Sequence, residues 1–91
     1  MKIIEFDGRE FKDIECTHEI IKSKLDLPEY YGNNLDALWD CLTGWIDVPI
    51  LIKWNNYNES YNYLGSYAKE LMSVFEDASD EVEEFTFELE E

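Results

Sequence analysis

The chain has 91 residues and carries 22 acidic against 7 basic side chains, which gives a formal net charge of -15. This charge excludes nucleic acid and anionic membranes as favourable partners, because both would repel the protein. Hydrophobic residues make up 45% and aromatic residues 15% of the sequence, which is enough for a packed interior and excludes wholesale disorder. The length fits a single domain spanning residues 1–91.

The excess of acidic side chains favours a basic protein as partner, since opposite charge accelerates the approach of two proteins. The alternative is that the acidic side chains serve only to keep the protein in solution and not to bind a partner. No run of ~18 apolar residues is present, so we expect no membrane span. The N-terminal sequence MKIIEFDGRE has neither the long apolar segment nor the small-residue cleavage site of a signal peptide. We therefore expect a cytoplasmic protein.

The first part of the chain predicts a strand followed by a helix. Residues 2–6 form the strand, and Asp7-Gly8 the turn that ends it. Asp13 suits the N-cap of the helix, which we expect to end at Leu27-Pro28 because proline disfavours helix at the residue before it. Side chains on one face of this helix recur every three or four residues and are Phe11, Ile14, His18, Ile21 and Leu25. On this face, His18 is expected to be a core histidine bonded to a backbone carbonyl.

A loop at residues 29–33 leads to a second helix, for which Asn33 or Asn34 can serve as N-cap and Gly44 as the end. The side chains expected to be buried on this helix are Leu35, Leu38, Cys41 and Leu42. The opposite face, expected to be exposed, carries Asp36, Trp39, Asp40 and Thr43.

The second half of the chain predicts a strand, two helices and a final strand. Residues 48–54, VPILIKW, are expected to form a strand buried on both faces. Residues 55–63 predict a short helix, in which Tyr57 and Tyr61 share one face. From Ser66 a longer helix follows, with its apolar face at Leu64, Ala68, Leu71, Phe75, Ala78 and Val82. The final strand is indicated by the alternation of Phe85, Phe87 and Leu89 with polar residues.

The predicted order of elements is β-α-α-β-α-α-β. Helical connections between successive strands imply parallel pairing with right-handed crossovers. We therefore expect an α/β fold, in which a small three-stranded parallel sheet is packed with helices.

Catalytic interpretations of the sequence are weak. Asp36 and Asp40 lie four residues apart and could act as general acid and base, but such a pair needs a cleft and this helix face is expected to be open. His18 could activate Cys16 or Cys41. Neither cysteine belongs to a CxxC pair, so both are expected to be buried thiols, with a disulfide or a metal site as less favoured alternatives. We expect no enzyme, no metal site and no cofactor.

The exposed face of the second helix favours a binding surface. Trp39 has no predicted role in the core, and tryptophan is typical of interface hot spots. Asp36 and Asp40 repel each other at helical spacing, which costs the helix ~0.2–0.5 kcal/mol, and Asp77 and Glu81 repeat this arrangement on the later helix. The alternative is that this face is an ordinary solvent-exposed acidic surface, on which the aromatic residue lies by chance. A carboxylate on such a surface can take the place of a substrate phosphate in a ribonuclease cleft lined with basic residues.

The stretch LPEYYGNNLDALWDCLTGW, residues 27–45, resembles the barstar family of intracellular inhibitors of barnase-type ribonucleases. VPILIKW, SVFEDA and the final strand also fit that family, so the resemblance covers nearly the whole chain. It implies a three-stranded parallel sheet with helices, and a second helix that enters the ribonuclease active site together with the loop before it. It also implies a cis peptide bond at Val48-Pro49.

The resemblance further implies a set of partner-binding residues. Asp40 matches the aspartate that occupies the phosphate position, and Asp77 stands where the family has a longer glutamate. The complete set is Tyr30, Asn34, Asp36, Trp39, Asp40, Thr43, Trp45, Asp77 and Glu81. Asn33 departs from the family pattern, which has a glutamate there, and the C-terminal sequence FELEE is more acidic than the family's.

The expected function is inhibition of a basic, extracellular-type ribonuclease in a one-to-one complex, by a protein that is a monomer when free. A barstar-like interaction module with a basic partner that is not a ribonuclease is the main alternative. An enzyme that uses Asp36 and Asp40 is a third hypothesis.

Overall fold

The computed structural model describes residues 1–91 and confirms the predicted succession of strands and helices. In chain order the elements are β1 (Lys2–Asp7), the 3-10 helix η1 (Gly8–Glu10), α1 (Ile14–Leu25), α2 (Leu35–Gly44), β2 (Ile50–Asn55), α3 (Tyr57–Leu64), α4 (Ser66–Glu81) and β3 (Phe85–Leu89). The turn expected at Asp7-Gly8 is the start of η1. None of the helices combines the length and the apolar character that crossing a membrane requires.

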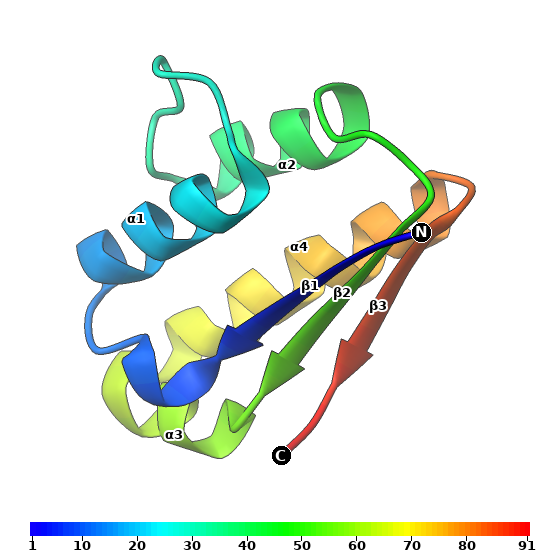
Figure 1. Cartoon of the computed structure of the whole chain (residues 1–91). Coiled ribbons are helices and arrows are strands. Elements are labelled where there is room, and N and C mark those ends of the chain that lie inside the picture. Colours follow the sequence, from blue (N-terminus) through cyan, green and yellow to red (C-terminus); the bar gives the residue numbers. More distant parts are fainter.

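The three strands form one parallel sheet in the order β1-β2-β3, with Ile4, Ile52 and Phe87 in register across it. Two right-handed crossovers that both step in the same direction leave their helices on one face of the sheet. Figure 1 shows the strands side by side with α4 crossing behind them. The α/β fold is therefore as predicted, with a single layer of helices.

The opposite face of the sheet is uncovered, which corrects the prediction that residues 48–54 are buried on both sides. Along β2, Ile50, Ile52 and Trp54 are buried, whereas the residues between them are only partly so. On the uncovered face Glu5, Lys53 and Glu88 are in register, and the Lys53 ammonium lies 4.0 Å from the Glu88 carboxylate. The apolar content of the sequence alone could not reveal that one face of the sheet is uncovered, because leucine and isoleucine also occur on that face.

The residues before β2 also differ from the prediction. The strand begins at Ile50 and not at Val48, and both Val48 and Pro49 are exposed. The peptide bond between them is cis, as the family resemblance implied. The segment connects α2 to the central strand, and the Pro49 carbonyl already accepts a hydrogen bond of 3.2 Å from the Lys2 amide of β1.

The core between sheet and helices is rich in aromatic side chains. Phe6, Phe11, Trp54 and Phe75 are fully buried, and the rings of Phe11 and Trp54 lie 5.4 Å apart. The Trp54 indole N–H donates to the hydroxyl of buried Ser60 at 3.0 Å, so its polar edge is satisfied inside the core. This cluster fixes β1, β2 and α4 relative to one another and so supports α2, which packs against α4.

Several side chains at the predicted boundaries are more exposed than expected. Ile14 is 46% exposed because it is the first residue of α1 and precedes the turns that pack on the sheet. Leu35, in the same position of α2, is partly buried, and Cys16 is partly buried while Cys41 is buried. Helix α1 ends at Leu25, before the predicted Leu27, since Asp26 adopts a left-handed conformation with φ of 53°.

Candidate functional site

The N-terminus of α2 is organised by Asn34. Its side-chain oxygen accepts a hydrogen bond of 2.8 Å from the Ala37 amide, and its side-chain nitrogen donates to the Gly32 carbonyl at 3.2 Å. Of the two predicted caps, Asn34 is therefore the one used. Capping satisfies amides that the first turn leaves without intrahelical partners, and it sets the angle at which the loop enters the helix.

Asn33 holds the loop in a second way. Its backbone is left-handed, with φ of 52°, a conformation that asparagine tolerates better than most residues. Its side-chain nitrogen donates to the Glu19 carboxylate at 3.0 Å. The loop before α2 is thereby tied to α1.

The adjacent tyrosines of the loop point in opposite directions. Tyr30 is 80% exposed, while Tyr31 is 6% exposed and places its hydroxyl 2.6 Å from Nδ1 of His18. The other ring nitrogen of His18 lies 2.6 Å from the hydroxyl of Tyr67 on α4. The prediction that His18 bonds a backbone carbonyl is therefore wrong, although its burial is as predicted. Sequence reasoning also missed Tyr67, which precedes Ala68 of the apolar face.

The exposed face of α2 presents Asp36 and Asp40 to solvent. Trp39, expected on the same face, is partly buried and packs against the core, which corrects its predicted exposure. An indole at the flank of a helix is large enough to reach the neighbouring core side chains. Thr43 is also partly buried and donates its hydroxyl to the Trp39 carbonyl at 2.8 Å.

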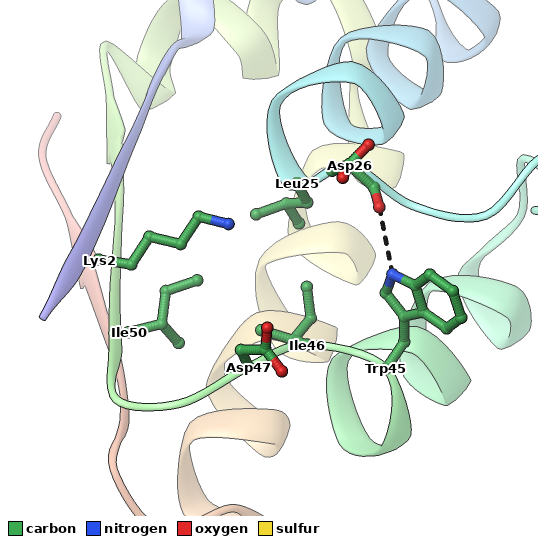
Figure 2. Close-up of a pocket in the computed structure, with 7 residues that line it drawn as sticks. All are labelled: Lys2, Leu25, Asp26, Trp45, Ile46, Asp47 and Ile50. Carbon is green, nitrogen blue, oxygen red and sulfur yellow. Dashed lines mark hydrogen bonds between the residues drawn. The ribbon is translucent and has the colours of Figure 1, made fainter.

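Trp45 follows the last residue of α2 and contacts the end of α1. Its indole N–H donates to the backbone carbonyl of Asp26 at 3.1 Å, and half of its surface stays exposed. Figure 2 shows this bond at the rim of a cleft, into which the Lys2 side chain extends from β1. The cleft is lined by Lys2, Leu25, Asp26, Trp45, Ile46, Asp47 and Ile50.

Helix α4 adds two of the predicted acids to this region. Asp77 and Glu81 are exposed on a helix that packs directly against α2. The structure contains three ion pairs, and none of them involves Asp36, Asp40, Asp77 or Glu81. These four carboxylates are left without cationic partners in the free protein.

The arrangement gives no support to nucleophilic chemistry. Both ring nitrogens of His18 are bonded to tyrosine hydroxyls, so neither is directed at a thiol. Burial, and then the nearby Asp40 carboxylate, raises the pKa of the Cys41 thiol, which keeps it in the less reactive protonated form. No group of three His, Cys, Asp or Glu side chains is placed to hold a metal ion.

The site therefore consists of exposed carboxylates on two packed helices, α2 and α4, with exposed aromatic rings at both ends of α2. Tyr30 lies before its N-terminus and Trp45 after its C-terminus. Such a surface is suited to binding a basic protein, because unpaired carboxylates can accept charge-assisted hydrogen bonds while the rings supply apolar contact.

Comparison with known proteins agrees with this geometry. The family model described as "Barstar (barnase inhibitor)" matches residues 1–90. A protein of Bacillus subtilis (strain 168) named "Putative ribonuclease inhibitor YrdF" is 49% identical over 84 residues, which cover 92% of this chain and 92% of that protein.

Proposed function

The chain belongs to the barstar family of ribonuclease inhibitors, and on this premise we propose that it forms a one-to-one complex with a barnase-type ribonuclease. Helix α2 and the loop before it block the active site, so the protein acts by binding and not by catalysis. The inhibitor is a monomer when free and works in the cytoplasm of the cell that makes the enzyme.

Asp40 is the residue that takes the place of a substrate phosphate. It is exposed near the middle of α2 and has no ion-pair partner in the free protein. A ribonuclease cleft holds several basic side chains, which can donate short charge-assisted bonds to one carboxylate. Because Asp40 sits on a helix, its position is set before binding and little ordering is needed.

Asp36 on α2, and Asp77 and Glu81 on the neighbouring helix α4, add further negative charge to the surface that carries Asp40. Their main contribution is to the rate and orientation of approach, since rim charges change the association rate more than the final affinity. Asp77 is one methylene shorter than the glutamate of the family pattern, so its direct contact with the partner is weaker.

Tyr30, Trp39 and Trp45 provide the apolar frame. Aromatic side chains at an interface bury large areas and keep water away from the charged contacts at the centre. Asn34 and Thr43 donate inside the chain, the Asn34 side-chain nitrogen to the Gly32 carbonyl and the Thr43 hydroxyl to the Trp39 carbonyl. Toward a partner, Asn34 and Thr43 act chiefly as rigid parts of the contact surface and as hydrogen-bond acceptors.

The single observation that carries the proposal is the set of four exposed, unpaired carboxylates on α2 and α4, flanked by Tyr30 and Trp45. The test is a titration of a purified barnase-type ribonuclease with this protein, following RNA cleavage at low and high salt. We expect loss of cleavage at one equivalent, with an onset that slows as salt screens the charges.

Glu59→Gln is the matched control in that titration, because it removes one exposed carboxylate from α3 and leaves the four acids of the site intact. It should inhibit as the natural protein does. Absence of inhibition at micromolar concentration would contradict the proposal and favour a basic partner that is not a ribonuclease.

A further inference from the structure

The shortest side-chain hydrogen bonds of the structure are centred on His18. This side chain is fully buried, and both of its ring nitrogens lie 2.6 Å from tyrosine hydroxyls. The three residues come from different parts of the fold: His18 from α1, Tyr31 from the loop before α2, and Tyr67 from α4. His18 and Tyr67 are 49 positions apart in the chain. The imidazole therefore joins two helices and the loop at a single point.

Hydrogen-bond accounting makes this arrangement specific for neutral imidazole. A neutral ring has one N–H donor and one acceptor nitrogen, so one tyrosine hydroxyl accepts from the ring while the other donates to it. A protonated ring has two donors and no acceptor. The hydroxyl that had donated to the ring would then have to turn its hydrogen elsewhere. Tyr67 is partly exposed, but the hydrogen of buried Tyr31 would have no water to bond. Leaving such a buried donor without a partner is unfavourable.

We propose that His18 and Tyr67 are positioning residues that hold the α1–α2 loop, residues 26–34, in its partner-binding geometry, and that protonation of His18 loosens this hold. The inference rests on the proposed function, since the loop carries Tyr30 and Asn34 into the interface. Tyr31 transmits the effect because its hydroxyl is bonded to His18 while its neighbour Tyr30 faces solvent.

Burial is the cause of the lowered pKa of His18, and no neighbouring charge contributes to it. The titratable groups that face it are the hydroxyl of Tyr31 from the loop and the hydroxyl of Tyr67 from α4. Beyond them, Cys41 of α2 influences Tyr31, and Glu70 of α4 influences Tyr67. Burial raises the pKa of both tyrosines, so they stay neutral throughout the range in which a histidine titrates.

The direction of the pH effect follows from the burial of the ring. Burial lowers the pKa of His18 below the ordinary value of 6.5. A histidine whose pKa is lowered by folding stabilises the folded arrangement above the ordinary value, and this stabilisation is lost as the pH falls below it. The loop is therefore held fully above pH 6.5 and progressively less below it.

Other contacts keep the loop attached when the His18 contact is lost. Leu27 and Pro28 are buried, and the Tyr31 amide donates to the Pro28 carbonyl at 3.0 Å. The Trp45 indole holds the first residue of the loop from the other side. We expect variants at His18 to fold, with a loop that is more mobile.

The decisive experiment compares the natural protein with His18→Gln in complexes with a barnase-type ribonuclease between pH 5 and pH 8. Glutamine does not titrate and can reach only one of the two hydroxyls. The ratio of the two dissociation constants at each pH cancels the titration of groups in the ribonuclease. We expect the variant to bind roughly fivefold more weakly at pH 8, the equivalent of one typical hydrogen bond, and the ratio to fall toward one as the pH is lowered below 6.5. A ratio independent of pH would overturn the proposal.

Two further variants separate positioning from general stability. Tyr67→Phe removes only the hydroxyl on α4 and should weaken binding at pH 8 to a similar extent. Tyr57→Phe is the control, because it removes a hydroxyl from another buried tyrosine, on α3, away from the loop. It should bind as the natural protein does.

Amide hydrogen exchange in the free protein tests the inference independently of any ribonuclease. In His18→Gln, protection factors should fall for amides of residues 26–34 and stay unchanged for β2. The natural protein should show the same selective loss below pH 6.5. If exchange follows this pattern and no ribonuclease is inhibited, the positioning role stands and the proposed partner is wrong. An equal loss of protection in the loop and in β2 would mean that His18 serves only global stability, and would refute the inference.

Discussion

The indole N–H of Trp45 donates a hydrogen bond of 3.1 Å to the backbone carbonyl of Asp26. This contact joins the residue after α2 to the residue that ends α1, across 19 positions of sequence. The Trp45 side chain thus links the two ends of the segment that consists of the α1–α2 loop and α2. Trp45 was predicted as a partner contact only, and the structure gives it a second task in the free protein.

Trp45→Phe separates these two tasks, because phenylalanine keeps an aromatic ring and lacks the N–H. We expect the free energy of unfolding to fall by ~1 kcal/mol or less, since Asp26 is exposed and water can bond its carbonyl in place of the indole N–H. Urea denaturation measures this change. Unaltered stability together with weaker ribonuclease binding would show that Trp45 acts only at the interface.

Asp40→Ala is expected to weaken ribonuclease binding by at least ~2 kcal/mol, or roughly thirtyfold in the dissociation constant. This is the general range for breaking a buried interfacial charge pair, for which the barnase–barstar complex is itself a reference case. Isothermal titration calorimetry against a barnase-type ribonuclease measures the effect, with Glu59→Ala on α3 as a control. A change of less than threefold in the dissociation constant would contradict the role of Asp40 as a phosphate mimic.

Asp77→Glu is expected to tighten binding by a few-fold, because the added methylene restores the reach of the family's glutamate. Asp77→Asn should weaken binding instead. Measurement of association and dissociation rates distinguishes a direct contact, which changes dissociation, from a long-range charge effect, which changes association. Asp77 makes no direct contact if the Glu and natural forms dissociate at the same rate.

The Arg9 side chain is expected to control the titration of Asp7, at the end of β1. Hydrogen bonds from the Arg9 guanidinium, and then from its backbone amide, hold the pKa of Asp7 well below its usual value of 3.8. In Arg9→Gln the pKa should rise toward 3.8 without reaching it, because the amide and Asn56 still donate to the carboxylate. The shift can be followed by NMR titration of the Asp7 carboxyl carbon.

Lys12→Gln is the matched control for this titration, since it removes an exposed positive charge near η1 that forms no ion pair with Asp7. The sign of the stability effect follows from the lowered pKa. The Arg9 contact stabilises the fold above pH 3.8, and its contribution is lost as the pH falls from 3.8 toward the lower pKa of the folded state. A pKa of Asp7 that is equal in the natural protein and in Arg9→Gln would contradict the assigned cause.

Local signals in the sequence were sufficient to predict the elements and much of the candidate surface. The spacing of Leu71, Phe75 and Ala78 predicted α4, and the alternation of Phe85 and Phe87 predicted β3, because helix and strand geometry impose their own periods on buried side chains. Asn34 was among the predicted caps for a similar reason, since a cap acts within three residues of itself.

The resemblance of residues 27–45 to a known family supplied the remaining site residues. Residue identity alone could align Asp77 with a family position, but it could not show that the side chain is exposed and unpaired on a helix packed against α2. The exposure of Asp36 and Asp40 was predictable from the helical period, whereas that of Trp39 was not.

By itself, the sequence determined the order of the elements, the parallel sheet and the acidic helix of the candidate site. Only the tertiary structure decided which face of the sheet is covered, how deeply Trp39 is buried, and that His18 is bonded to Tyr31 and Tyr67. The physical reason is how far apart in the chain the interacting residues lie. Periodicity and capping depend on residues within a turn or two, whereas these features depend on segments up to 49 positions apart that meet only after both crossovers have formed.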